Sequence, residues 1–443
     1  MAEKLTNEQQ AAVDSRERSL LVSAAAGSGK TKVLVERLFS YVEREGANLD
    51  DFLIITYTRA AASELRGKIA KALTERMERD PANYHLRQQM LRVYRADIKT
   101  VDAFCTALLR ENCHLLGEDA RGHALRPDFR VLDENEAQVL RERVLARTLD
   151  DFYGRLTTGS TLLADTLGAG RDDSALEDLV LELHAKLQAQ PYEDKWLEAQ
   201  RAFWRAVPDK IEDTPYGKIL LNEVRRKARH CKNLLQRAAQ EMCANDALNQ
   251  KYAPAFLDAS YQLEALEGKT AEGWDAARGV TIAFPRLAAV KDSDGGEMKA
   301  RMKSLWDNCK ETVKGFAEIF SASSDEAVED LRTMAPAMLA LIDLTADFSR
   351  RYNEEKRRRN SADFSDQEHE AIRLLIGEDG APTELARIVS ARYREIMVDE
   401  YQDTNEVQNR IFDAISCKGE NLFTVGDVKQ SIYRFRLADP RIF

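Results

Sequence analysis

The sequence predicts an α/β fold in which a parallel sheet domain is interrupted by a large helical insertion. Short apolar runs alternate with helix-forming segments over residues 1–110, whereas the apolar residues of the following segments mostly keep helical spacing. Two further apolar runs, each ending in acidic residues, return within residues 394–427. Strand–helix–strand order at short spacing produces parallel strands. The simplest architecture is therefore one sheet domain built from both parts of the chain.

Three strands and two helices are expected in the first part. The run SLLVSA at 19–24 is a short strand, FLIITYT at 52–58 suits a strand buried on both faces, and IKTV at 98–101 is a weaker strand candidate. Residues 31–42 place apolar side chains on one helical face, and residues 59–77 are rich in strong helix formers.

The middle of the chain is expected to be helical. In the helix predicted over 133–153, Asp133 is a plausible N-cap and Glu136 completes a capping box. The stripe of apolar residues from Leu331 to Phe348 indicates ordinary helix packing. Residues 157–174 and 291–296 are rich in Gly, Ser, Thr and Asp and are expected to be loops.

The strand pattern returns in REIMVDE at 394–400 and NLFTVGD at 421–427. These patterns divide the chain into 1–110 as the first half of the sheet domain, 111–362 as the helical insertion, and 363–443 as the second half. The division depends on where strand patterning stops and where it resumes.

Composition excludes several classes of protein. The chain has 443 residues, 44% of them hydrophobic and 32% charged, which suffices for a large core. It has no apolar run of roughly 18 residues that could cross a membrane, and its N-terminus lacks a signal peptide, so a cytoplasmic protein is expected. Six dispersed cysteines without a C-x-x-C pair argue against a metal cluster. The net charge of −10 argues against a surface coated for nucleic acid but allows binding in a local groove.

The segment SAAAGSGKT at 23–31 lies between a predicted strand and a predicted helix. It is close to the phosphate-binding pattern G-x-x-x-x-G-K-[ST], with Ala24 in place of the first glycine. Gly27 and Gly29 allow the backbone to approach phosphate oxygens, and the helix N-terminus attracts the anion. The alternative is a Gly/Ala-rich turn that happens to precede Lys-Thr. The residues expected around the phosphates are Ala24, Ala25, Ala26, Gly27, Ser28, Gly29, Lys30 and Thr31.

An acidic pair in IMVDEYQDTNEVQ at 396–408 is the natural partner of this loop. Lys30 is expected to reach the β- and γ-phosphates and Thr31 to hold Mg²⁺ through its hydroxyl. Asp399 is expected to hold the same Mg²⁺, and Glu400 to orient or deprotonate the attacking water. Alone, an acidic pair after a strand is usually a solvated strand end; with the loop it predicts a nucleoside-triphosphate hydrolysis site.

These segments carry a family resemblance. The phosphate loop, DEYQDTN at 399–405 and GDVKQSIYRFR at 426–436 resemble motifs I, II and III of the superfamily 1A DNA helicases of the UvrD/Rep/PcrA/RecB group. Three further segments resemble other motifs of that group: LTNEQQAAV at 5–13, TYTRAAASELRGKI at 56–69 and TVDAFC at 100–105. Together with DFSDQEH at 363–369, the combination is most similar to the AddA group of helicase–nuclease proteins. The resemblance implies a RecA-like P-loop NTPase domain (1A) with an all-helical inserted domain (1B).

The resemblance also implies functional roles. It implies a 3′-to-5′ DNA helicase that uses ATP and Mg²⁺, with Gln9 reading the adenine and Gln430 sensing the γ-phosphate. It implies that Phe435 stacks on bases of single-stranded DNA, as aromatic side chains between arginines can. Tyr433 either stacks or packs in the core, and Tyr57 either touches DNA with Thr58 or is buried in the sheet.

Some residues depart from the family pattern. Arg59 stands where the family usually has Asn, and Asp102 stands where it usually has His, so a DNA contact at Asp102 is not expected. The basic run at 356–359 has Glu354 and Glu355 beside it and is expected to be a solvated helix face.

The resemblance covers motifs I to III only. No equivalent of motifs IV to VI, of the second motor domain (2A) or of the nuclease domain is found, so the chain alone is expected to bind ATP weakly and not to unwind DNA. The implied partners are an AddB-like subunit, single-stranded DNA and duplex DNA. The alternatives are a stand-alone UvrD-like helicase without a nuclease, or a non-catalytic DNA-binding module that kept the fold.

Overall fold

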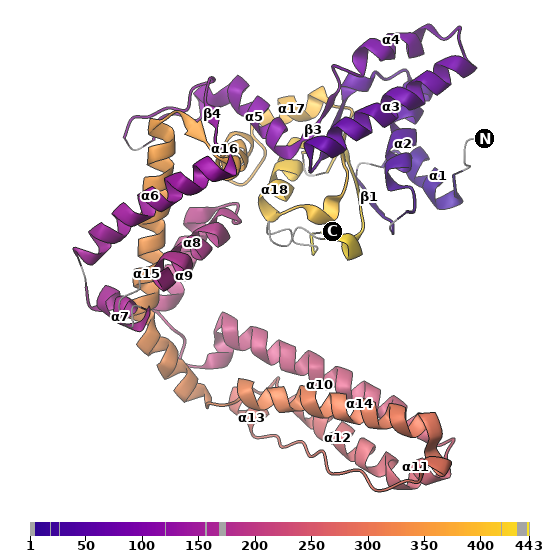
Figure 1. Cartoon of the computed structure of the whole chain (residues 1–443), viewed down its shortest axis with the longest axis vertical. Coiled ribbons are helices and arrows are strands. Elements are labelled where there is room, and N and C mark those ends of the chain that lie inside the picture. Colours follow the sequence, from indigo (N-terminus) through magenta and orange to yellow (C-terminus); the bar gives the residue numbers. More distant parts are fainter. Residues whose placement is uncertain are drawn as a thin grey trace. The chain divides into compact units, whose positions relative to one another are not determined.

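The computed structural model describes residues 5–17, 19–25, 27–119, 121–155, 157–167, 174–417, 419–431 and 441–442. The chain forms two compact units (Figure 1). The sheet unit comprises residues 1–156, 164–198 and 342–443, and the helical unit comprises residues 157–163 and 199–341. The boundaries expected near residues 110 and 362 stay a prediction.

The sheet unit contains a five-stranded parallel sheet in the order β1-β7-β6-β2-β3. Its strands are β1 (Ser19–Ser23), β2 (Phe52–Thr56), β3 (Asp97–Thr100), β6 (Glu395–Val398) and β7 (Leu422–Gly426). All five were predicted from apolar runs. Because β7 and β6 lie between β1 and β2, the two parts of the chain interleave within one sheet.

Helices cover both faces of this sheet (Figure 1). Alternate residues along β2 point to opposite faces: Phe52 and Ile54 join one buried cluster, and Leu53 and Ile55 join the other. The first cluster packs against α1 (Asn7–Asp14), α2 (Lys30–Glu45), α3 (Arg59–Arg79) and α4 (Tyr84–Arg92). The second packs against α5 (Val101–Asn112), α16 (Phe364–Leu375), α17 (Glu384–Arg392) and α18 (Glu406–Ile415). Such a sheet is buried on both sides, which explains the continuous apolar runs in the sequence.

A buried ion pair joins the two parts of the sheet unit. Arg37 of α2 is fully buried and donates to both carboxylate oxygens of Glu395, at 2.8 and 2.5 Å. The Tyr41 hydroxyl donates to the same carboxylate at 3.1 Å, and Arg37 also donates to the carbonyls of Ala12 and Ser15. Full hydrogen bonding of this kind is what a buried charge pair requires.

The sheet unit also contains helices that follow the first strands. They are α6 (Glu134–Tyr153), α8 (Ser174–Gln188), the start of α9 (Glu193–Arg205) and the last part of α15 (Ser324–Arg358). The capping box predicted at Asp133 and Glu136 is present at the start of α6. Two short strands, β4 (Arg130–Val131) and β5 (Ser361–Ala362), pair in parallel within this region and were not predicted.

The helical unit is built on three long helices that lie side by side, α10 (Pro215–Met242), α12 (Ala253–Lys269) and α14 (Asp292–Ile319) (Figure 1). Their shared core includes Trp306, whose ring stacks on Phe256 with centroids 4.8 Å apart. The smaller helices are α7 (Thr158–Leu167), α11 (Asp246–Lys251) and α13 (Trp274–Arg278). No helix in the described part of the chain is both long and apolar enough to span a bilayer.

Two expectations for loops and one for a surface were wrong. Residues 158–167 form α7 because Leu163 anchors the segment by burial, and α14 already begins at Asp292 with a kink at Gly296. Lys356, expected on a solvated face, is buried, and its ammonium lies 2.8 Å from Asp363 and 2.7 Å from Asp366. The two acidic partners lie beyond the end of its helix, so the local charge pattern did not reveal them.

Candidate functional site

The phosphate-loop segment has the backbone that its glycines predicted. Gly27 and Gly29 have φ of 72° and 81°, in the left-handed region that glycine adopts readily. Helix α2 begins directly after Gly29, and no side chain caps its N-terminus. The Gln9 side-chain amide donates to the Ser28 carbonyl at 2.7 Å, which joins α1 to the loop.

This loop fits an anion by its unpaired polar groups. The first N–H groups of a helix have no partner within the helix, and together with the helix dipole they attract phosphate. The buried Ser28 hydroxyl also has no hydrogen-bond partner in the described part of the chain. The Ala24 N–H donates to the Gly426 carbonyl at 3.0 Å, and the Ser28 N–H to the Ala25 carbonyl at 3.1 Å, so the loop is fixed to the end of β7. Ala26 lies outside the described residues.

The acidic pair follows β6 directly. Glu400 has φ of 52°, a left-handed backbone that is uncommon for a residue with a side chain. The Lys30 ammonium lies 3.0 Å from the Glu400 carboxylate, across 370 residues of sequence. Burial raises the pKa of Asp399 to about 6, and the negative charge of Glu400 adds to this rise. The local chemistry therefore favours a cation next to this carboxylate.

Most of the predicted site residues line one cavity of about 420 Å³ in the sheet unit. It is lined by Thr31, Thr56, Tyr57, Thr58, Ala61, Glu64, Leu65, Lys68, Asp399, Glu400, Gln402, Asp403 and Gln430. Lys30 reaches the cavity through its contact with Glu400, whereas Gln9 lies against Ser28 of the loop and is not part of the cavity lining. The structure thus brings together residues from motifs Ia, II and III and the end of the phosphate loop.

Gln402 is a site residue that the sequence did not single out. Its side-chain amide donates to Glu400 at 2.8 Å, and its carbonyl oxygen accepts the Asp427 N–H at 2.8 Å. The Gln430 side chain in turn donates to the Asp427 carboxylate. Gln402 is buried and so forms a continuous link from Glu400 to Gln430. The only signal in the sequence was a polar residue within a segment that otherwise buries its side chains.

The predicted DNA contacts differ in what the structure shows of them. The Tyr57 ring is partly buried against the core, and its hydroxyl bonds to the Thr404 hydroxyl. Burial raises the pKa of this hydroxyl far above its usual range. Thr58 is exposed and caps α3 by accepting the Ala61 N–H at 3.0 Å. Tyr433 and Phe435 lie outside the described residues.

The same motifs recur in a known family of proteins. The UvrD/REP helicase N-terminal domain matches this chain over residues 5–443, which includes both parts of the sheet unit and all of the helical unit. The chain belongs to this family. As a UvrD/REP-type chain it has the phosphate loop and the acidic pair in the order in which the sequence presented them.

Curated relatives carry one shared name, that of an ATP-dependent helicase/nuclease subunit of the AddA type. The chain is 34% identical to the protein of that name from Ruminiclostridium cellulolyticum, over 99% of this chain and 36% of the relative. It is 38% identical to that of Desulfitobacterium hafniense strain DCB-2, over 99% of this chain and 33% of the relative. It is 36% identical to that of Alkaliphilus oremlandii, over 99% and 36%. This UvrD/REP-type chain therefore spans about a third of the length of the curated relatives it matches.

Proposed function

We propose that this chain is the ATP-binding and DNA-binding part of a 3′-to-5′ DNA helicase of the AddA type. The observation that carries the proposal is the contact between Lys30 and Glu400 at the end of an uncapped helix. It joins a phosphate loop to an acidic pair that a long insertion separates in sequence. A solvated strand end or a chance Gly-rich turn would have no reason to form this contact.

The side chains fit ATP with Mg²⁺. Among the described residues, no cluster of three His, Cys, Asp or Glu side chains could hold a metal ion alone. Mg²⁺ usually keeps several waters and binds one or two carboxylates together with substrate phosphates, which agrees with Thr31 and Asp399 as its protein ligands. Bound Mg²⁺ would neutralise charge on the transferred phosphoryl group. Gln9, fixed against the loop, is in place to hydrogen-bond the adenine.

The chain's own groups then have distinct tasks. Lys30, released from Glu400, binds the phosphate oxygens, and Glu400 orients the attacking water and accepts its proton. Because Gln402 bonds to both Glu400 and the Asp427 backbone, a shift of Gln430 at the γ-phosphate is transmitted to the water-orienting carboxylate. This chain of hydrogen bonds provides a physical route by which hydrolysis and DNA contact could influence each other.

The wider assignment follows the relatives. We place single-stranded DNA at Thr58, Tyr57, Tyr433 and Phe435, and the protein partner in this proposal is an AddB-like subunit. The names of the relatives support a nuclease activity in a longer protein and, with it, a role in DNA repair. A cytoplasmic location follows from the proposed action on chromosomal DNA.

The test is nucleotide binding and DNA-stimulated ATP hydrolysis by this chain with Lys30→Ala. We expect the substitution to weaken binding of a fluorescent ATP analogue and to abolish any hydrolysis that DNA stimulates. Lys71→Ala is the matched control, because Lys71 is an exposed lysine of α3 outside the cavity. Equal nucleotide binding by the wild type and the Lys30 variant would refute the proposal.

A further inference from the structure

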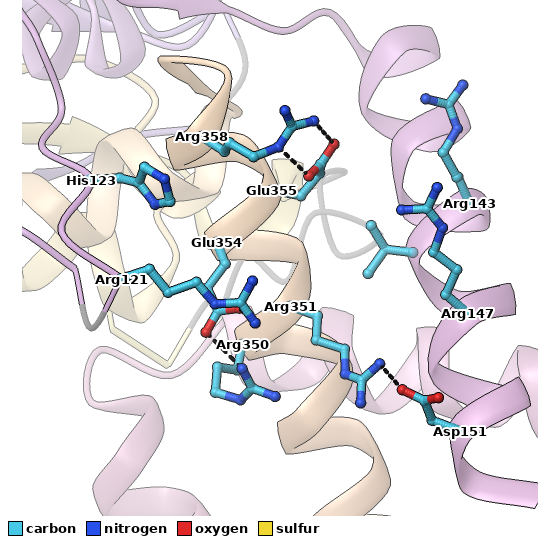
Figure 2. A pocket seen from close by; sticks show the side chains of 11 residues that line it. Arg121, His123, Arg143, Arg147, Asp151, Arg350, Arg351, Glu354, Glu355 and Arg358 are labelled. Atoms are coloured by element: carbon cyan, nitrogen blue, oxygen red, sulfur yellow. Dashed lines mark hydrogen bonds and ion pairs between the residues drawn. The ribbon is translucent and has the colours of Figure 1, made fainter. Parts of the chain in front are cut away.

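A second pocket in the sheet unit is rich in arginine and belongs to none of the motifs above. It has a volume of about 340 Å³ and lies between α6, the last part of α15 and the segment around residues 121–123 (Figure 2). Its lining is Arg121, His123, Arg143, Val144, Arg147, Asp151, Arg350, Arg351, Glu354, Glu355 and Arg358. Six arginines thus face three carboxylates.

Four of these arginines are neutralised by acidic neighbours, in a set of ion pairs that also involves Asp347. The pairs are Arg121 with Glu354, Arg350 with Glu354 and Asp347, Arg351 with Asp151 and Asp347, and Arg358 with Glu355. The hydrogen bonds from Arg358 are the main cause that lowers the pKa of Glu355 to about 2. The carboxylates therefore stay ionised and occupied by these arginines.

Arg143 and Arg147 carry the excess positive charge. They lie one turn apart on α6, and Figure 2 shows both extending from the same helix beside the pocket. Neither forms a hydrogen bond or ion pair with another residue in the described part of the chain, and both are exposed. Like charges four residues apart destabilise a helix by about 0.2–0.5 kcal/mol. The fold alone gives no reason for this pair.

We propose that this pocket binds two neighbouring phosphates of a nucleic-acid strand through Arg143 and Arg147. Guanidinium groups bind phosphate oxygens with two parallel N–H bonds, and one helical turn places the two Cβ atoms about 5–6 Å apart. The paired arginines are also half exposed: Arg121, Arg350 and Arg358 have 60%, 50% and 59% of their side chains accessible. The pocket is therefore open to a polymer and not closed around a small ion.

The choice of nucleic acid as the occupant rests on the proposed function. The chain as a whole has a net charge of −10, so a polyanion is repelled by most of the surface and held only where positive charge is in local excess. The contact is to the backbone and predicts no preference for sequence. It lies on α6 and α15 and not in the cavity that holds Asp399 and Glu400, so it is a separate anchoring point for the strand.

The test is DNA binding by this chain with Arg143→Gln and Arg147→Gln combined, measured by fluorescence anisotropy on a duplex with a single-stranded tail. We expect affinity to fall about 5- to 30-fold. The slope of log affinity against log salt should become shallower by about 0.7–0.9 for each arginine. Arg387→Gln is the matched control, since Arg387 is exposed on α17 and pairs with Glu384 of its own helix. Unchanged affinity and slope in the double variant would overturn the inference.

Modification of arginines by phenylglyoxal, read by mass spectrometry, gives a second readout on the wild-type chain. DNA should protect Arg143 and Arg147 and leave Arg387 reactive. Protection by poly-glutamate or by inorganic phosphate, with none by DNA at the same ionic strength, would overturn the inference in favour of an acidic polypeptide or a small anion. If the wild-type chain bound no DNA at any salt concentration, the proposed function would fail. If it bound DNA with these arginines unprotected, only the present inference would fail.

Discussion

Gln402 offers the sharpest test of how the candidate site is held together. In Gln402→Leu, a side chain of similar size replaces the amide, so that the Asp427 N–H loses its acceptor and Glu400 loses one donor. Both Gln402 and Asp427 are buried, with 2% and 9% of their surface exposed. Water therefore cannot readily replace the missing acceptor.

The expected loss of stability follows from these two contacts. A buried backbone N–H without a partner costs about 1–3 kcal/mol. The bond to Glu400 adds no more than about 1 kcal/mol, because 46% of that side chain is accessible and solvent screens it. A total of about 2–4 kcal/mol corresponds to amide exchange that is about 30- to 700-fold faster.

The assay is hydrogen–deuterium exchange of the β7 amides, followed by mass spectrometry over residues 422–431. Gln402→Glu is the informative companion, because it keeps an acceptor for Asp427 but places a second carboxylate beside Glu400. Its destabilisation should be present at pH 8 and shrink as the pH falls and one carboxyl of the pair takes up a proton. Wild-type exchange rates in Gln402→Leu would refute the linkage described here.

Three further predictions concern stability and nucleotide binding. Arg37→Met leaves Glu395 buried without its partner and should cost about 3–5 kcal/mol in urea unfolding, whereas adding Glu395→Leu should recover most of the loss; no recovery would contradict the pairing. Burial raises the pKa of Glu368 from 4.5 to about 7, so stability is lost as the pH rises between these two values and the buried group must ionise. Glu368→Gln should therefore stabilise the protein by up to about 3 kcal/mol at pH 8 and much less at pH 5, read from melting temperatures; equal effects at both would contradict this. Gly29→Ala forces a side chain into a left-handed backbone, 3.3 Å from the Gln9 amide, and should weaken binding of a fluorescent ATP analogue by about 5- to 30-fold, with unchanged binding as the contrary result.

Local patterns in the sequence were enough to predict most elements of the sheet unit. The apolar runs became β1, β2, β3, β6 and β7, and the capping box at Asp133 marked the start of α6. These features are decided by neighbours in sequence: alternation, helical spacing, and a side chain that reaches a backbone N–H three residues on.

What the sequence did not reveal depends on contacts between distant residues. The burial of Lys356 requires Asp363 and Asp366 to fold back onto the end of its helix. The link through Gln402 requires β6 and β7 to lie side by side, which no local pattern specifies. In the phosphate loop, by contrast, the chemistry was legible because glycines, lysine and threonine act there as consecutive residues.

The strand order has a consequence for how the chain is made. β1 and β2 are not neighbours in the sheet, since β7 and β6 separate them. During synthesis the first three strands emerge before residues 101–394, and only β2 and β3 can pair until β6 and β7 follow. Ribosomes add about 5–20 residues per second, so β1 waits for its partner for tens of seconds. In that interval the helical unit, whose core comes entirely from residues 211–331, can already fold. Newly made chains would therefore pass through a state with finished helices and an open strand edge, the state on which chaperones act.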